Sequence, residues 1–299
     1  MNELLHSLDW VLPLRSEALT PVMRVFTLLG YEKFILFFLP LGYWAWNRGV
    51  FLRLLVLVAV TALINAWLKD YWQDPRPDIA LRMDHEVGDS FGLPSGHAQI
   101  AVVIWFWLAF ELRRAWAWVV SGVVVAGIIF SRLYLGAHDV EDVLGGSLLG
   151  IATLLVFAQA GQWNWWREAH GLWHLALILL VFLAGWLTWP GVAPSYVPLL
   201  AGLMAGVLFG YRQIEFSADV ATWRRLLAAV IGAVSFIVLQ KALKLAGTAW
   251  PLDPQLWQGL RGLVMGLFVA AAMPWALVRL GLLKSVNKPK VEALAGSAA

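Results

Sequence analysis

Residues 50–68 read VFLRLLVLVAVTALINAWL, and the only charge in this stretch is Arg53. A helix needs about 20 mostly apolar residues to cross a bilayer, and it satisfies its own backbone hydrogen bonds there, so the stretch predicts a membrane-spanning helix. The whole chain has the same character. Of its 299 residues, 61% are hydrophobic and 14% are charged, whereas a soluble domain carries about 25% charged residues. The sequence therefore predicts an all-α polytopic membrane protein.

Eight more apolar runs predict further spans, which makes nine in total. The nine runs lie at residues 31–47, 50–68, 97–112, 115–134, 139–160, 171–189, 195–211, 225–246 and 258–281. Pro190 and Pro194 bracket a short hinge after the sixth run. This hinge separates a six-helix core from three additional C-terminal helices.

The chain therefore divides into four predicted parts. Residues 31–190 form the core, and residues 191–283 hold the additional helices. Residues 1–30 contain an amphipathic segment that is broken by Pro13. We expect this segment to lie at the membrane interface, and the alternative is a partly ordered tail. Residues 284–299 form a tail that we expect in the cytoplasm.

Lysines and arginines predict the orientation in the membrane. With nine spans, one face carries twelve of these residues and the other ten, and leaving out three cations assigned to a site below gives twelve against seven. The face with more Lys and Arg is usually cytoplasmic, and it includes Lys284, Lys288 and Lys290 of the tail. We therefore expect a bacterial-type inner-membrane protein whose N-terminus faces the extracytoplasmic side.

Composition disfavours several kinds of site. The chain has no cysteine, so it has neither disulfides nor thiolate metal ligands. Its positive charges lie singly or in pairs between apolar runs, which argues against a nucleic-acid partner. His170 and His174 have the spacing of a metal pair on a helix, but no third ligand is in reach. We therefore predict neither a metal nor another cofactor, and the oligomeric state stays open.

Residues 131–142, SRLYLGAHDVED, lie between the fourth and fifth runs. His138 and Asp142 are four residues apart, which places both side chains on one face of a helix. A carboxylate that accepts a hydrogen bond from one ring nitrogen leaves the other nitrogen free to attack, and it stabilises the positive charge that develops. Taken alone, such a pair is more often a histidine at a helix start beside a solvated acid.

Residues 91–97, FGLPSGH, run directly into the third span. Ser95 is a good N-cap residue, and a helix N-terminus with a glycine presents free N–H groups to an anion. His97 would lie beside that anion, where it suits a general acid that protonates a leaving oxygen. The alternative is an ordinary capped helix with an interfacial histidine.

Residues 69–77, KDYWQDPRP, follow the second span. Arg76 lies between two prolines in a rigid, extended turn, and its guanidinium suits bidentate phosphate contact, whereas Lys69 would act as a point charge. Taken alone, the two cations are more often interfacial residues that snorkel to the headgroups.

Span ends alternate between the two faces of the membrane, so all three segments are expected on the extracytoplasmic face. There they would gather three cations, two histidines and one carboxylate: Lys69, Arg76, Arg132, His97, His138 and Asp142. Charged residues near a bilayer usually mark function. This set fits phosphoryl transfer, because the cations can neutralise the phosphoryl oxygens without a metal.

The pattern Lys-x6-Arg-Pro, Pro-Ser-Gly-His and Ser-Arg-x5-His-x3-Asp resembles that of the type 2 phosphatidic acid phosphatase (PAP2) superfamily. The resemblance covers roughly residues 15–190 and implies a metal-independent, six-helix catalytic core. It implies that His138 is transiently phosphorylated, that Asp142 supports it and that His97 protonates the leaving group. It also implies the residues that bind the phosphoryl oxygens, namely Lys69, Arg76, Ser95, Gly96 and Arg132. The nine-span layout is similar to that of glucose-6-phosphatase, in architecture only.

Three functions stay open at this point. The first is hydrolysis of a lipid phosphate or diphosphate on the extracytoplasmic side, with undecaprenyl diphosphate, phosphatidylglycerol phosphate, phosphatidic acid and lipid A phosphates as candidate substrates. The second is transfer of the phosphoryl group to a lipid acceptor. The third is lipid binding or transport without catalysis. In each case the expected partner is a phosphorylated lipid in the membrane.

Two polar groups outside the motifs have two interpretations each. The acidic run of Asp84, Glu86 and Asp89 is either a loop that determines specificity or a solvated loop. Lys241 and Lys244, at the end of the eighth run, either bind a second phosphate or snorkel to the headgroups.

Overall fold

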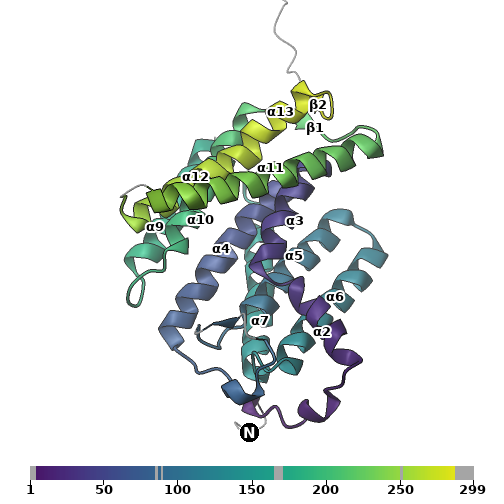
Figure 1. Ribbon diagram of the computed structural model, residues 1–299, viewed down its shortest axis with the longest axis vertical. Coiled ribbons are helices and arrows are strands. Elements are labelled where there is room, and N and C mark those ends of the chain that lie inside the picture. The colour runs from purple at the N-terminus through teal and green to yellow at the C-terminus, as the bar shows by residue number, and fades with distance from the viewer. Residues whose placement is uncertain (1–4, 85–86, 89, 165–170, 250–251, 287–299) are drawn as a thin grey trace, which may run out of the picture. The chain divides into compact units, whose positions relative to one another are not determined.

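The protein is helical almost throughout the part of the chain that its structure, a computed structural model, describes (Figure 1). That part comprises residues 5–84, 87–88, 90–164, 171–249 and 252–286. One short antiparallel pair joins the strands Phe216–Ser217 (β1) and Lys284–Ser285 (β2). The predicted all-α architecture is therefore confirmed. Contacts between residues divide the chain into two compact units: Met1–Leu39 with Arg53–Val197, and Pro40–Leu52 with Pro198–Ala299.

The helices of the described residues follow one another along the chain, because turn residues and prolines separate the apolar runs. Up to the hinge they are η1 (Leu12–Leu14), α2 (Leu19–Leu28), α3 (Glu32–Ala45), α4 (Arg48–Trp72), η2 (Ile79–Leu81), α5 (Gly96–Leu112), α6 (Ala115–Tyr134), α7 (Val140–Ala160) and α9 (Gly171–Leu187). After the hinge they are α10 (Tyr196–Gln213), α11 (Thr222–Ala249), α12 (Pro254–Leu267), the π-helix η4 (Phe268–Ala272) and α13 (Met273–Arg279).

Each of the nine predicted runs coincides with a helix, but the helices differ in length. Among the described residues, five helical segments are long and apolar enough to cross a membrane: α4, α6, α7, α11 and the segment Pro254–Arg279. Helices α2 and α3 meet at a bend of 55° and would make a sixth span together. Helices α5 and Leu172–Leu187 are apolar but shorter. A polytopic protein is therefore confirmed, while the number of nine spans stays a prediction.

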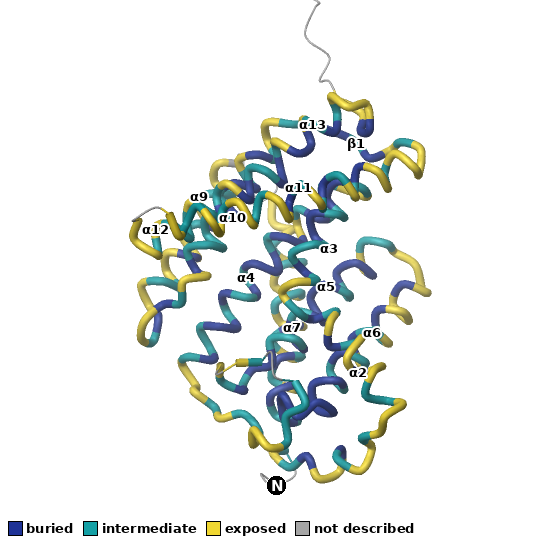
Figure 2. The backbone as a smooth tube through the Cα atoms, in the orientation of Figure 1, coloured by how far each residue is buried: buried dark blue, intermediate teal, exposed yellow. Residues whose placement is uncertain are grey.

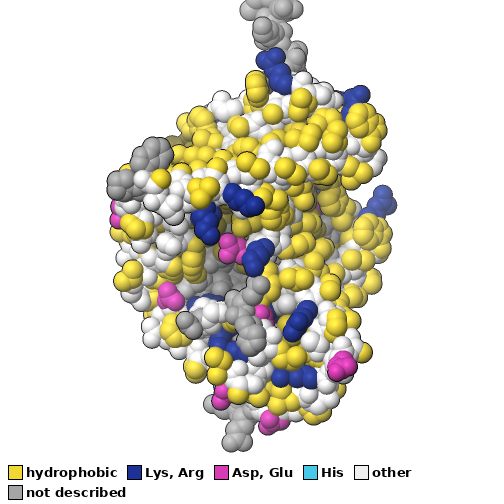
Figure 3. Space-filling view, in the orientation of Figure 1, with side chains coloured by type: hydrophobic (Ala, Val, Ile, Leu, Met, Phe, Trp, Pro, Cys, Tyr) yellow, Lys and Arg dark blue, Asp and Glu magenta, His cyan; other side chains and the backbone are white. Residues whose placement is uncertain are grey.

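Hydrophobic side chains cover much of the face shown in Figure 3, as expected for helices that meet lipid rather than water. Helix α7 illustrates this, since Leu144, Leu148 and Leu155 are all more than half exposed. Most of the predicted tail, residues 287–299, lies outside the described residues.

The N-terminal segment packs against the core. Leu8 and Val11 are buried in a cluster that includes Leu133 and Tyr134 of α6. The main-chain N–H of Ser16 donates to the Tyr134 hydroxyl at 2.8 Å. Two of the apolar residues that the sequence assigned to a membrane interface therefore cover the end of α6 instead, and the interfacial position of the segment stays a prediction.

Helix α5 lies at the centre of the first unit, in contact with α6 and α7, and most of its residues are buried (Figure 2). Its close approach to α7 depends on two glycines, Gly146 and Gly150, whose four-residue spacing is typical of tight helix packing. A Cβ atom on Gly146 would overlap the Ser95 carbonyl, and one on Gly150 would meet the Gln99 carbonyl and Val102. These glycines bring the first turn of α5 directly against the first turns of α7.

Gly146→Ala is expected to destabilise the protein by about 1–3 kcal/mol, because the new methyl group meets backbone that cannot rotate away. Thermal unfolding in detergent, followed by tryptophan fluorescence, measures the effect. Gly122→Ala is the matched control, since a Cβ there has no atom within 4 Å and alanine favours a helix over glycine. Equal midpoints for the two variants would contradict the packing account.

Candidate active site

His138 lies in the short connection between α6 and α7, and local backbone contacts fix it there. Gly136 turns the chain with φ 66°, a conformation that favours glycine. The Arg132 carbonyl then accepts the N–H groups of Ala137 at 3.0 Å and His138 at 3.3 Å. Asp139 caps α7, and its carboxylate accepts the N–H of Asp142 at 3.0 Å. These contacts hold His138 one residue before the N-cap of α7.

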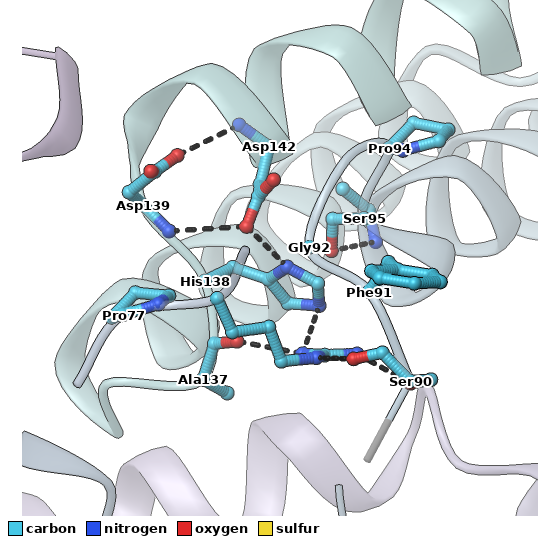
Figure 4. Close-up of polar contacts among 12 residues, drawn as sticks. Pro77, Ser90, Phe91, Gly92, Pro94, Ser95, Ala137, His138, Asp139 and Asp142 are labelled. Atoms are coloured by element: carbon cyan, nitrogen blue, oxygen red, sulfur yellow. Dashed lines mark hydrogen bonds and ion pairs between the residues drawn. The ribbon is translucent and has the colours of Figure 1, made fainter. Parts of the chain in front are cut away.

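The predicted histidine–carboxylate pair is formed (Figure 4). His138 Nδ1 lies 2.7 Å from Asp142 Oδ2, and the two side chains are 2% and 0% exposed. Asp142 is therefore not a solvated acid, which removes the alternative that the sequence left open. With the carboxylate accepting the Nδ1 proton, Nε2 of His138 carries the free lone pair.

Arg76 faces that lone pair. Its Nη1 lies 3.0 Å from His138 Nε2 and also donates to the Ala137 carbonyl at 2.7 Å. The other side of the guanidinium donates to the carbonyl and the hydroxyl of Ser90, at 2.5 and 2.9 Å. Burial, and then the charge of Arg132, lower the pKa of Arg76 to about 10, so it stays charged at neutral pH. A fixed guanidinium therefore lies where His138 would attack.

Lys69 and Arg132 complete the cationic set from the last turns of α4 and α6. Lys69 Nζ donates to the carbonyls of Phe91 and Gly92, the latter at 2.7 Å. Arg132 Nη1 donates to Asp84 Oδ2 at 2.7 Å and to Thr27 Oγ1. From the sequence, Asp84 was noted only as part of an acidic run, and no contact of Thr27 with the site was predicted. The other two acids of that run, residues 86 and 89, lie outside the described residues.

The loop before α5 packs directly against Asp142. Ser95 caps α5 as predicted, and its own N–H donates to the Asp142 carbonyl at 2.9 Å. A Cβ on Gly92 would meet both carboxylate oxygens of Asp142, and one on Gly96 would crowd Asn65 Oδ1. The close approach of loop and helix therefore requires glycine at position 92, which the motif pattern did not indicate.

His97 lies in the first turn of α5. Its Nε2 is buried and has no hydrogen-bond partner in the described part of the chain. Its ring makes an edge-to-face contact with Tyr31, with ring centroids 4.8 Å apart at 86°. The same burial without a partner holds for Arg132 Nε and Asp142 Oδ1. Buried polar atoms normally have partners, and the two nitrogens, His97 Nε2 and Arg132 Nε, can donate to a polar ligand.

Burial lowers the pKa of His138 well below its ordinary value of 6.5, and the charges of Arg76, Lys69 and Arg132 lower it further. The structure thus brings the three predicted cations close enough to act on one imidazole. His138 is therefore neutral at neutral pH, and it loses its nucleophilic lone pair only when the pH falls through this lowered pKa.

The acid limb of kcat/KM for phosphate release is accordingly expected below pH 6.5. Arg76→Gln removes a charge that lowers the pKa of His138, so its acid limb is expected at higher pH than that of the wild type. Comparing the two proteins on one substrate cancels the ionisation of the substrate phosphate, whose own pKa is about 6. Coincident limbs would contradict this assignment.

His6, near the N-terminus, makes a contact that was not predicted from the sequence. His6 Nδ1 lies 2.8 Å from Asp139 Oδ2, and its Nε2 lies 3.0 Å from Glu141 Oε2. The hydrogen bond with Asp139, followed by the nearby carboxylate charges, raises the pKa of His6. The N-terminal segment is thereby tied to the capping residue of α7, next to the candidate site.

Other polar residues singled out from the sequence lie elsewhere. Lys241 and Lys244 are exposed on α11, in the second unit. His174 lies on α9, whereas its suggested partner, residue 170, is outside the described residues. No group of three His, Asp or Glu that could hold a metal is found among the residues that the structure describes. The expectation of a metal-free site stays a prediction.

Comparisons with known proteins cover the whole set of candidate residues. A model of the PAP2 superfamily matches residues 50–166, and a model described as the transmembrane extension of PAP2 superfamily phosphatases matches residues 195–286. The first match contains every candidate residue from Lys69 to Asp142, but neither Thr27 nor Tyr31.

Three similar proteins illustrate the range of relatives. Phosphatidylglycerophosphatase B of Bacillus subtilis is 33% identical over 165 residues, which are 50% of this chain and 77% of the relative. Sphingosine-1-phosphate phosphatase 2 of Mus musculus is 31% identical over 136 residues, or 43% of this chain and 38% of the relative. The human form is 32% identical over 144 residues, or 46% and 36%. This chain thus matches less than half the length of the two sphingosine-1-phosphate phosphatases.

Among solved structures, the chain is similar to the crystal structure of a transmembrane PAP2 type phosphatidylglycerolphosphate phosphatase from Bacillus subtilis. The sequence identity is 26%, the match covers 52% of this chain and 82% of that chain, and the TM-score is 0.46.

Proposed function

Because this chain belongs to the PAP2 superfamily, we propose that it is a membrane phosphatase that hydrolyses a lipid phosphate or diphosphate through a phosphohistidine intermediate. The observation that carries the proposal is the buried pair of His138 and Asp142, whose free imidazole nitrogen faces the guanidinium of Arg76. A neutral imidazole beside a fixed cation is suited to attack a phosphoryl group whose oxygens that cation binds.

In the first step, Nε2 of His138 attacks phosphorus and the bond from phosphorus to the lipid oxygen breaks. His97 gives its proton to that oxygen, so that the product leaves as an alcohol, or as a lipid monophosphate from a diphosphate. Asp142 stabilises the positive charge that the attack produces on the imidazole of His138.

In the second step, a water molecule attacks the phosphohistidine. His97, now without its proton, accepts one from the water, and the phosphorus–nitrogen bond breaks to release inorganic phosphate. Both histidines then return to their starting states. One group thus acts as acid and then as base, which keeps the proton count balanced over the cycle.

Three cations replace a metal in this scheme. Lys69, Arg76 and Arg132 neutralise the oxygens of the phosphoryl group. The hydroxyl of Ser95 and the N–H of Gly96 at the start of α5 donate to the same oxygens, at the positive end of a helix dipole. Arg76 can give up its contact with His138 Nε2 when a phosphoryl group arrives, since three further hydrogen bonds to Ser90 and Ala137 hold the guanidinium in place.

The substrate is a phosphorylated lipid whose headgroup reaches the site from the bilayer on the extracytoplasmic side of an inner membrane. The names of the relatives support this class, because they are phosphatases of phosphatidylglycerophosphate and of sphingosine-1-phosphate. The distribution of Lys and Arg supports the orientation.

The direct test is phosphate release by the purified protein in a metal chelator, over phosphatidylglycerol phosphate, phosphatidic acid, sphingosine-1-phosphate and undecaprenyl diphosphate. Release is expected to continue at the same rate with chelator, because cations of the chain neutralise the phosphoryl oxygens. Loss of release that Mg²⁺ restores would contradict metal independence. Labelled phosphate that appears in lipid rather than in solution would indicate a transferase, and no turnover with saturable lipid binding would indicate a binding protein.

A further inference from the structure

Tyr31 contacts two parts of the candidate site although it lies outside the family match and outside all three motifs. It stands at the bend between α2 and α3. Its hydroxyl donates to the Asp84 carboxylate at 2.5 Å. Its ring meets the ring of His97 edge to face, with centroids 4.8 Å apart. The side chain of Tyr31 thus contacts both His97, the proposed general acid, and Asp84 of a different loop.

Asp84 in turn holds Arg132. The carboxylate accepts from Arg132 Nη1 at 2.7 Å, and the two side chains are 8% and 1% exposed. Charge-assisted hydrogen bonds at such distances are stronger than neutral ones. Thr27, one helical turn before Tyr31, accepts from the same Nη1, and the Arg132 guanidinium lies 5.9 Å from the centre of the Tyr31 ring. Arg132 is therefore enclosed by residues from the α2–α3 bend and from the loop of Asp84.

Each of the two site residues near Tyr31, Arg132 and His97, has one buried polar atom without a partner among the described residues. Nε of Arg132 and Nε2 of His97 are buried and make no hydrogen bond in the described part of the chain. In the proposed reaction both act on the same phosphoryl ester, since Arg132 binds a non-bridging oxygen and His97 protonates the bridging one. Their relative position must match the spacing of neighbouring oxygens, and small errors in such positions are costly.

We propose that Tyr31 is a positioning residue that sets Arg132 and His97 relative to each other. Its hydroxyl acts on Arg132 through Asp84, and its ring acts on His97 directly. This inference rests on the proposed phosphatase function. The hydroxyl and the ring of Tyr31 therefore have separate effects, and different substitutions remove them.

Tyr31→Phe removes the hydroxyl and keeps the ring. We expect orthovanadate, which mimics the phosphoryl group, to bind about tenfold more weakly, because a hydrogen bond to a charged group is lost. KM is expected to rise by a similar factor with little change in kcat. The loss should be equal for an alkyl phosphate lipid and for p-nitrophenyl phosphate, since the leaving-group acid keeps its support.

Tyr31→Leu removes the ring as well, so that His97 loses its support. We expect a further loss in kcat of about tenfold on the alkyl phosphate lipid, but only a small one on p-nitrophenyl phosphate, whose good leaving group needs little protonation. His97→Ala sets the limit of this leaving-group effect. A merely structural role of Tyr31 would lower both rates in parallel and would overturn the proposal.

Tyr71→Phe is the matched control, because Tyr71 is 60% exposed near the end of α4 and stacks on Trp67 through its ring. It should leave vanadate binding and both rates unchanged. Vanadate binding is measured by calorimetry and needs no turnover. If the wild type binds vanadate but releases no phosphate from any substrate, the proposed function fails while the Tyr31→Phe comparison still tests the coupling to Arg132. Equal vanadate affinity of wild type and Tyr31→Phe overturns the inference.

Discussion

His138→Ala is expected to lower phosphate release by at least about 10⁴-fold, because it removes the group that forms the bond to phosphorus. In the described part of the chain, its side chain is hydrogen-bonded to Asp142 and Arg76, and both partners are held by further contacts of their own. The variant is therefore expected to fold. Rates are measured with the substrate that the wild type prefers, and thermal unfolding and orthovanadate binding confirm an intact site.

His174→Ala is the matched control for this experiment. His174 lies on α9, outside the three motif segments. Its replacement is expected to leave turnover within about twofold, because substitutions away from the site and the core usually have small effects. A folded His138→Ala variant that still releases phosphate at a rate near that of the wild type would exclude His138 as the nucleophile.

Asp142→Asn is expected to lower kcat by about 10²- to 10⁴-fold while changing KM little. The amide cannot stabilise a cationic imidazole as a carboxylate does, and its NH₂ group favours the wrong tautomer of His138. The distance of 2.7 Å between Nδ1 and Oδ2 and the full burial of Asp142 mean that no water can take over this role. The kinetic constants of the purified variant test the expectation.

Glu141→Gln provides the control on the same helical turn. Glu141 is 43% exposed and pairs with His6 rather than with His138. Its replacement is expected to leave kcat within about twofold, because exposed pairs contribute little. If the two variants lose activity equally, the effect of Asp142→Asn reflects the charge of the α7 N-terminus and not the support of His138.

The helices were predictable from the sequence because apolar runs and turn residues are local signals. The run at residues 50–68 became α4, and the Pro-Ser-Gly-His segment became a capped helix start at Ser95. The spacing of Gly146 and Gly150 indicates close packing of α7 on another helix, but it does not indicate that this helix is α5. In these cases a few neighbouring residues determine the outcome.

The surroundings of the site could not be predicted in this way. The contacts of Tyr31 with Asp84 and of Arg132 with Thr27 join residues 53 and 105 positions apart. They depend on the 55° bend between α2 and α3, where Gly30 marks a break in the sequence but indicates neither the angle nor the partners of the bend. The same holds for the packing of Val11 on α6. Long-range contacts of this kind follow from the tertiary fold and have no signature in sequence spacing.

The central claim, a phosphoryl group on His138, is tested most directly by rapid quenching of the protein with a lipid phosphate labelled in its phosphoryl group. The account predicts a labelled protein whose label is stable to alkali and lost in acid, as for phosphohistidine, and which maps to the peptide that contains His138. Asp142→Asn should form this intermediate more slowly, and His138→Ala should not form it. Label on another residue, or full turnover without labelled protein under conditions that trap the intermediate, would contradict the account.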